Sequence, residues 1–258
     1  EWSYDRLFEA AEQRHVEAIV FGGDILKLPP RGGDRMKPQK DFLEGWLSPR
    51  LERFKACPVF TMMGNDDWVA FMPLLEELER DGHLRLMHLK KQELVKDYMI
   101  IGYSCVPVTP FFMKDWDRMD APGWEPEERP WSCLFTDTGS LREGTYEEVR
   151  RRPTIEAELA PLLPDPKTVV VTHTPPWKTK LDIMWNGRPI GSHAGRAYLE
   201  THQPFLSLHG HGHESPQMTG AILDRLGKTI MINPGDSLSA FRAVEIDLEK
   251  PSAPVLLT

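Results

Sequence analysis

Five polar side chains whose types suit metal binding lie in short segments that follow apolar runs: Asp24, Asn65, His173, His211 and His213. Together they offer carboxylate and amide oxygens and imidazole nitrogens, with no thiolate among them. This donor set favours a divalent ion such as Mn, Fe, Zn, Ni or Co and argues against a closed structural zinc site. Glycines stand beside nearly all of these residues, and glycine lets two backbones approach closely. The sequence therefore predicts a metal centre.

Each motif alone also has an ordinary structural explanation. Asp24 and Asn65 follow glycines in segments that could be turns or helix caps, and His173 could be a hydrogen-bonded residue at a strand end. The segment His211-Gly212-His213 is more specific, although histidine-rich loops also occur without a function. The prediction rests on the occurrence of these motifs in one order, each at the end of an expected strand.

The elements that must position these residues follow from an alternation of apolar runs and helical patterns. Runs bounded by Gly or Pro predict buried strands at residues 15–21, 58–63, 167–171 and 205–208. Amphipathic spacing predicts helices at residues 2–14, 67–81, 154–163 and 191–202. This alternation is typical of an α/β fold with a largely parallel sheet, whose ligands collect beyond the carboxyl ends of the strands. Short strands at residues 218–223, 229–233 and 243–248 predict a C-terminal antiparallel set that forms a second sheet layer.

The composition fits one soluble globular domain over residues 1–258, with 40% hydrophobic and 27% charged residues. A formal net charge of −8 disfavours general nucleic-acid binding. The uncharged stretch at residues 98–113 is too short and too polar for a membrane span, and no signal peptide is visible. Three widely spaced cysteines indicate a reducing compartment, so we expect a cytoplasmic protein with no membrane partner. The oligomeric state stays open.

Four motifs occur in a fixed order along the chain: Gly23-Asp24, Gly64-Asn65-Asp66-Asp67, His173 followed by Thr-Pro-Pro, and Gly210-His211-Gly212-His213. In this order they resemble the metal-binding signature of the calcineurin-like metallophosphoesterase superfamily. Residues 191–235 are similar to its Icc-like bacterial and archaeal branch, which is related to cyclic-nucleotide phosphodiesterases. The resemblance covers nearly the whole chain.

The resemblance implies a four-layer αββα sandwich with two divalent metal ions between its sheets. It also implies hydrolysis of a small phosphodiester or phosphomonoester, such as a nucleotide, by a metal-activated hydroxide. Carried over by position, Asp24 bridges both ions, His213 binds one, and the other is completed by Asn65, His173 and His211. Asp24, Asn65 and His211 are further implied to act in catalysis. Manganese is the first expectation for the ion, with Fe, Zn, Ni or Co as alternatives.

Two features depart from the family pattern. The family's Asp-x-His motif does not precede Asp24, and we expect it upstream of residue 1; without it, one ion keeps only Asp24 and His213. The segment Asp81-Gly82-His83 matches that motif literally but is predicted to be a helix-to-strand turn. Asp66 stands where many relatives have a His. We expect its side chain to turn away and cap the following helix, which implies slow turnover or a good leaving group.

Three further groups each have two explanations. Residues 106–139 are expected to form a lid-like loop whose tryptophans pack the lid, the alternative being that they stack on a base. His209 is expected to face the core and not the site. A basic cluster is expected to form a solvated loop, or else a rim that steers phosphate; it consists of Lys27, Arg31, Arg35 and Lys37.

The alternative to an enzyme is a catalytically degenerate protein of the same fold that serves as a scaffold for protein–protein interaction. The absent Asp-x-His motif and Asp66 favour this alternative. The presence of every other expected ligand argues against it, because a decayed site loses such polar residues.

Overall fold

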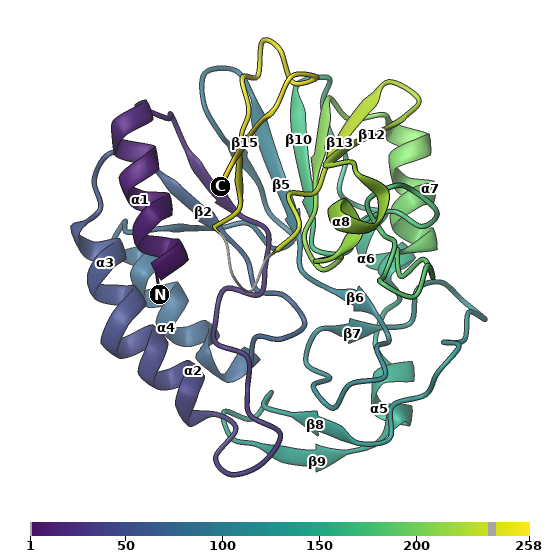
Figure 1. Cartoon of the computed structure of the whole chain (residues 1–258). Coiled ribbons are helices and arrows are strands. Elements are labelled where there is room, and N and C mark those ends of the chain that lie inside the picture. The colour runs from purple at the N-terminus through teal and green to yellow at the C-terminus, as the bar shows by residue number, and fades with distance from the viewer. Residues whose placement is uncertain (1, 237–240) are drawn as a thin grey trace.

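Two of the three strands of the first sheet form within apolar runs that precede candidate ligands. The computed structural model describes residues 2–236 and 241–258, and Figure 1 shows how its helices and strands are arranged. Strands β1 (Ile19–Phe21), β2 (Val59–Thr61) and β3 (Arg85–Leu86) are parallel and adjoin in the order β1-β2-β3. The runs at residues 15–21 and 58–63 thus form strands as predicted, but each pairs over three residues only.

A second sheet has six strands in the order β12-β13-β11-β10-β5-β4. Its parallel central strands are β5 (Met99–Tyr103), β10 (Thr168–Thr172), β11 (Leu206–Leu208) and β13 (Thr229–Ile232). The antiparallel edge strands are β4 (Lys91–Glu93) and β12 (Leu223–Leu226).

The C-terminal strands form antiparallel pairs as predicted, β12 with β13 and one further pair, but these pairs do not form one layer. Strand β13 is buried at every position, so it lies inside the second sheet and pairs in parallel with β11. Strand β14 (Ala243–Glu245) pairs instead with β15 (Val255–Leu257) in a small antiparallel sheet of their own.

Most predicted helices are present. Helix α1 (Trp2–Arg14) has the predicted bounds, and α4 (Met72–Arg80) follows a 3₁₀ turn, η2 (Val69–Phe71). Helices α6 (Ile155–Leu159) and α7 (His193–His202) lie within their predicted ranges. In the described part of the chain, no helix combines the length and the apolar character that a membrane crossing requires.

The sequence does not predict a helical segment before β2, or the short helix α5 (Tyr146–Arg150). That segment consists of α2 (Lys37–Phe42), the π-helical turn η1 (Leu43–Leu47) and α3 (Ser48–Arg53). Helix α8 (Ser215–Thr219) also replaces the start of the strand predicted at residues 218–223. Its first turn contains Pro216, and Gly220 follows its end with φ of 71°, so both are ordinary signals of a helix start and stop.

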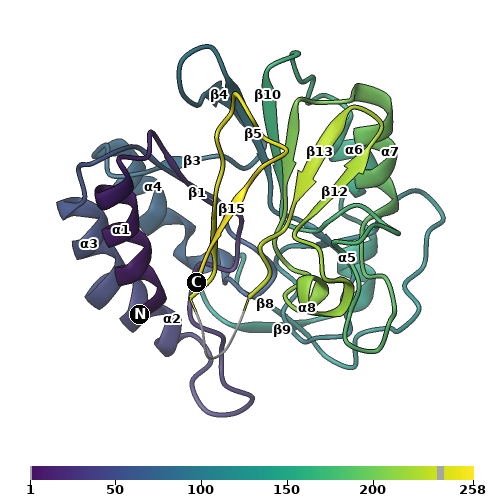
Figure 2. The same cartoon turned by 45° about the horizontal axis from the view of Figure 1, so that its top comes forward.

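The two sheets pack against each other through alternate side chains. In β10, Val169 and Val171 belong to the same apolar cluster as Phe60 of β2. Val170 points to the opposite face and belongs to the cluster that contains Leu199 of α7. This period of two places helices on the outer face of each sheet, with α1 and α4 beside the first and α6 and α7 beside the second (Figures 1 and 2).

The segment at residues 106–139 has packed stretches, such as residues 113–117 and 133–136, and a largely exposed stretch at residues 121–132, so the predicted lid stays a prediction. It contains β6 (Val106–Pro107), β7 (Asp117–Arg118) and β8 (Cys133–Phe135), the last of which pairs with β9 (Arg142–Gly144). Lys114 and Asp117 form an ion pair at 2.6 Å with no exposed side-chain surface, and Thr109 donates hydrogen bonds to the carboxylate. A buried charge pair needs such fixed partners, so this segment supports the fold.

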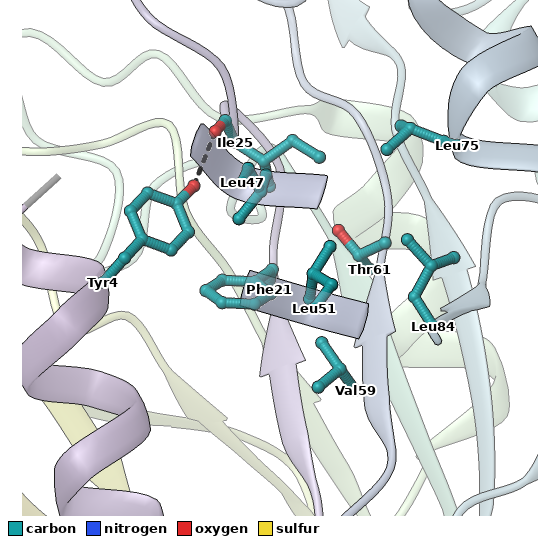
Figure 3. A pocket seen from close by; sticks show the side chains of 9 residues that line it. All are labelled: Tyr4, Phe21, Ile25, Leu47, Leu51, Val59, Thr61, Leu75 and Leu84. Carbon is teal, nitrogen blue, oxygen red and sulfur yellow. Dashed lines mark hydrogen bonds between the residues drawn. The ribbon is translucent and has the colours of Figure 1, made fainter. Parts of the chain in front are cut away.

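A small apolar cavity lies between the first sheet and its helices (Figure 3). Its volume is about 10 Å³, which is roughly the space of one water molecule. Tyr4 closes one side and donates its hydroxyl to the carbonyl of Ile25 at 2.6 Å. The hydroxyl of Thr61 also lines the cavity and is buried without a hydrogen-bond partner. The cavity is a packing defect, too small for a ligand.

Candidate metal centre

The carboxyl ends of β1, β2, β10 and β11 bring four of the five predicted ligands into one cluster. Asp24, His173 and His211 each offer a ligand atom, and these atoms all lie within 4.8 Å of one another. The Oδ1 atom of Asn65 lies 3.1 Å from Nε2 of His173 and 2.7 Å from Nδ1 of His211. Because these residues follow strands of both sheets, the packing of the sheets closes the cluster.

His213 lies at the solvent side of this cluster. Its Nε2 atom is 3.8 Å from Oδ2 of Asp24, and its side chain is 49% exposed. The same carboxylate oxygen lies 3.1 Å from Nε2 of His173, whose side chain is only 1% exposed. Asp24 therefore stands between a buried and an exposed imidazole.

The close approach of the loops depends on glycine. A Cβ atom at Gly64 would lie 2.4 Å from Oδ1 of Asp24, and one at Gly23 would lie 2.4 Å from Nδ1 of His173. Asp24 and His211 both have a φ of 52°, in the left-handed region that few side chains adopt. Such a conformation persists only where the surroundings fix it. Both candidate ligands are held by the loops around them.

Asp67 ties the loop after β1 to the loop after β2. Its side chain is fully buried, and Oδ2 accepts hydrogen bonds from the N–H groups of Gly64 at 2.8 Å and Ile25 at 3.0 Å. Its Oδ1 accepts from the N–H of Leu26 at 2.7 Å. These donors flank Asp24 and Asn65 in sequence, so Asp67 fixes the two ligands relative to each other. Sequence reasoning missed this role, because an acidic residue after a turn equally indicates a helix cap.

Asp66 does not cap a helix, contrary to the prediction. Helical structure begins later, at η2, and neither η2 nor α4 has a side-chain cap. Instead, Oδ1 of Asp66 accepts a hydrogen bond from Nδ2 of Asn65 at 2.9 Å. The backbone N–H of Asp66 donates to Oδ1 of Asp24, also at 2.9 Å. Asp66 is therefore part of the cluster.

The charges of the cluster are strongly coupled. Burial alone would raise the pKa of Asp24, but the charge and hydrogen bond of His173, with further hydrogen bonds, lower it well below its ordinary value. Burial alone would lower the pKa of His173, whereas the charge and hydrogen bond of Asp24 raise it to about 9. Burial, and then the charge of His173, lower the pKa of His211 to about 3. Among the protein groups alone, Asp24 and His173 thus form an ion pair beside a neutral His211.

The pKa of Asp66 shifts in the opposite direction to that of Asp24. Burial, followed by the charge of Asp24, raises the pKa of Asp66 to about 7. The same two causes raise the pKa of Asp67 to about 7, against the hydrogen bonds that its carboxylate accepts. Repulsion among these three carboxyls disfavours full ionisation, and a bound cation would relieve it.

The donor chemistry fits a divalent cation. Nδ1 of His173 lies 2.7 Å from the carbonyl oxygen of Gly22, which leaves Nε2 facing the oxygens of Asp24 and Asn65. A ligating histidine almost always uses its second nitrogen in this way. One side of the cluster thus offers oxygen and nitrogen donors from Asp24, Asn65, His173 and His211. In the described residues, the other side offers only Asp24 and His213 from the predicted set.

Two predictions that placed residues outside the site are confirmed. His209 is buried, its Nδ1 atom lies 3.0 Å from Oγ1 of Thr172, and burial lowers its pKa to about 4. Asp81-Gly82-His83 is a turn between α4 and β3, and Nδ1 of His83 contacts Nζ of Lys55 at 3.1 Å. Neither His209 nor His83 joins the cluster.

Two predictions remain, one for the tryptophans of residues 106–139 and one for the basic cluster. Trp116 is a core residue that donates its indole N–H to the carbonyl of Asp67 at 2.9 Å, so it is no platform for a base. In the basic cluster, the guanidinium of Arg35 lies 4.5 Å from the ring centre of Phe112, and Lys37 pairs with Asp41. Both explanations of that cluster stay open.

Comparison with known proteins identifies the fold but no family. No family model matches the chain, and no curated protein matches it. The chain is similar to the crystal structure of TT1561 of Thermus thermophilus, with 20% identity and a TM-score of 0.59 over 98% of this chain and 91% of that chain. A second crystal structure aligns with 17% identity and a TM-score of 0.59, over 98% of this chain and 92% of that chain. At these identities, the likeness shows a shared mixed α/β fold.

Proposed function

We propose that this chain is a binuclear metal-dependent phosphoesterase of the calcineurin-like type, with its two sheets and outer helices arranged as a four-layer αββα sandwich. The observation that carries the proposal is the cluster of Asp24, Asn65, His173 and His211. The sequence motifs predict these residues as ligands, and they lie at the ends of strands from both sheets. Each of these four side chains has another of them within 3.1 Å, and together they have the donor types of a divalent-metal site.

Asp24 and Asn65 have separate tasks in this proposal. Two bound divalent ions, with manganese as the first candidate, would supply Lewis acidity at phosphorus and a nucleophile from water at neutral pH. Asp24 offers one oxygen between His173 and His213, which suits a carboxylate shared by two cations. Asn65 offers a neutral oxygen, so the site keeps a positive charge toward an anionic substrate. His211, neutral by virtue of its burial, can serve as a nitrogen ligand without first losing a proton.

The proposed substrate is a small phosphodiester or phosphomonoester, a nucleotide being one candidate. The net charge of −8 disfavours general nucleic-acid binding, and the three widely spaced cysteines favour a cytoplasmic location. When ionised, Asp66 adds negative charge to the cluster, which favours a singly charged diester over a doubly charged monoester.

A scaffold with a degenerate site is the second candidate. It is favoured by the solvent side of the cluster, where the predicted ligands within the described residues are Asp24 and His213 only. A chain that binds a single ion, or none, would fit this candidate.

The test is hydrolysis of bis-p-nitrophenyl phosphate and p-nitrophenyl phosphate with Mn²⁺. Asp24→Asn should abolish turnover, whereas Asp81→Asn, at an exposed carboxyl beyond the end of α4, should leave it unchanged. His173→Asn should also abolish it, with His15→Asn at the opposite end of β1 as the matched control. An inactive wild-type protein that binds no Mn²⁺ would overturn the enzyme proposal in favour of the scaffold.

A further inference from the structure

An asparagine that serves as a metal ligand must present its oxygen, because the amide nitrogen carries two hydrogens and donates no lone pair. The two ends of the amide have nearly the same shape, so packing alone does not select the correct orientation. Oδ1 of Asn65 faces two imidazole nitrogens, at 3.1 Å and 2.7 Å. Some other contact has to hold Nδ2 on the opposite side.

Asp66 makes that contact. Its Oδ1 accepts a hydrogen bond from Nδ2 of Asn65 at 2.9 Å. Were the amide of Asn65 reversed, its oxygen would face the oxygen of Asp66, and its NH₂ group would face His173 and His211. When Asp66 is ionised, two facing acceptors repel each other, so the reversed orientation is disfavoured. We propose that Asp66 is a positioning residue that orients the Asn65 amide with its oxygen toward the metal centre, an inference that rests on the proposed function.

The backbone of Asp66 is fixed independently of its side chain. Its N–H donates to Oδ1 of Asp24 at 2.9 Å, and its carbonyl accepts from Nε2 of Gln39 at 2.5 Å. Asp66→Ala therefore removes the acceptor for Asn65 while both backbone anchors remain. Asp66→Asn keeps an acceptor of the same size in its side-chain oxygen. These two variants separate orientation of the amide from the negative charge of the carboxylate.

Manganese affinity, measured by titration calorimetry, is the first test. Loss of a group that orients a ligand typically costs 10–100-fold in metal affinity. We expect Asp66→Ala to weaken Mn²⁺ binding by about 10–100-fold, and Asp66→Asn to stay within a few fold of wild type. Asp81→Ala, at an exposed carboxyl, is the control and should bind as wild type does. Equal affinity of wild type and Asp66→Ala would overturn the proposal, and so would an equal loss in both Asp66 variants.

Side-chain amide NMR on protein without added metal is the second test, and it does not depend on the proposed function. The Nδ2 resonance of Asn65 is assigned by its disappearance in Asn65→Ser. We expect one of its protons to exchange with water more slowly in wild type and Asp66→Asn than in Asp66→Ala. Equal exchange in all three would overturn the orienting contact. Slow exchange in wild type without any Mn²⁺ binding would leave the contact standing and overturn the metallo-esterase instead.

Discussion

Asp67 should contribute more to the stability of this protein than any exposed carboxyl, because it joins two loops from a fully buried position. In Asp67→Asn, one oxygen remains and can keep the two hydrogen bonds from Gly64 and Ile25. Oδ1, which accepts from the N–H of Leu26 at 2.7 Å in the wild type, is replaced by an NH₂ group. This group faces the Leu26 N–H and cannot accept its hydrogen bond. One hydrogen bond is lost and a buried N–H group is left without an acceptor, so the expected cost is about 1–3 kcal/mol.

Asp67→Ala removes all three hydrogen bonds and leaves three buried N–H groups without an acceptor. A single substitution seldom costs more than about 5 kcal/mol, and we expect about 3–5 kcal/mol here. Burial and the charge of Asp24 raise the pKa of Asp67 to about 7, so ionisation of this carboxyl opposes folding, and the comparison belongs at pH 5, where the folded carboxyl is mainly neutral, as the Asn amide is.

The measurement is the free energy of unfolding in urea, with Asp81→Asn as the control. That exposed substitution should change stability by less than about 0.5 kcal/mol. If the three hydrogen bonds to Asp67 hold the loops together, wild type should be the most stable, Asp67→Asn less stable and Asp67→Ala the least stable. If Asp67→Asn were as stable as Asp81→Asn, the hydrogen bonds would not hold the loops and this reasoning would be refuted.

Three further predictions follow from buried groups. Thr61→Val should stabilise the protein by about 1 kcal/mol in urea unfolding, because the Thr61 hydroxyl is buried without a hydrogen-bond partner. Thr172→Val is the control and should destabilise the protein, because the Thr172 hydroxyl is hydrogen-bonded. Gly64→Ala should weaken Mn²⁺ binding at least about tenfold in calorimetry, since its Cβ would lie 2.4 Å from Oδ1 of Asp24. Burial lowers the pKa of His88 to about 4, below its unfolded value of 6.5, so this group contributes stability above pH 6.5 that is lost as the pH falls toward 4. Between pH 7 and pH 5 that loss is about 2 kcal/mol, and His88→Gln should remove it from the unfolding free energies at the two pH values.

The sequence predicts the strands that carry the ligands because each is a short apolar run with a sharp end. It cannot predict which strands pair, because pairing depends on contacts far apart in the chain. The run at residues 229–232 shows this: it predicts an antiparallel strand, and β13 does pair antiparallel with β12, but its other neighbour is the parallel strand β11. The helices at residues 37–53 escape prediction because the π-helical turn η1 shifts their periodicity.

The site residues divide in the same way. Asp24, Asn65, His173 and His211 are predictable because their types and order limit what they can do. Asp66 and Asp67 are not, because an acidic residue near a turn can cap a helix, clamp a loop or orient a neighbour. The structure shows that helical structure starts only at Val69, in η2, so neither carboxyl caps a helix. Both bind groups in or beside the cluster instead.

The two sides of the cluster differ in a way that bears on how metal would bind. His173 is 1% exposed, and its ring is fixed through Gly22, whereas His213 is 49% exposed. A ligand that is already fixed loses little conformational freedom on binding, whereas an exposed one must be ordered first. Binding at the buried side should therefore precede binding at the solvent side. A protein purified with one ion per chain, and filled to two only at added metal, would be the natural consequence of this asymmetry.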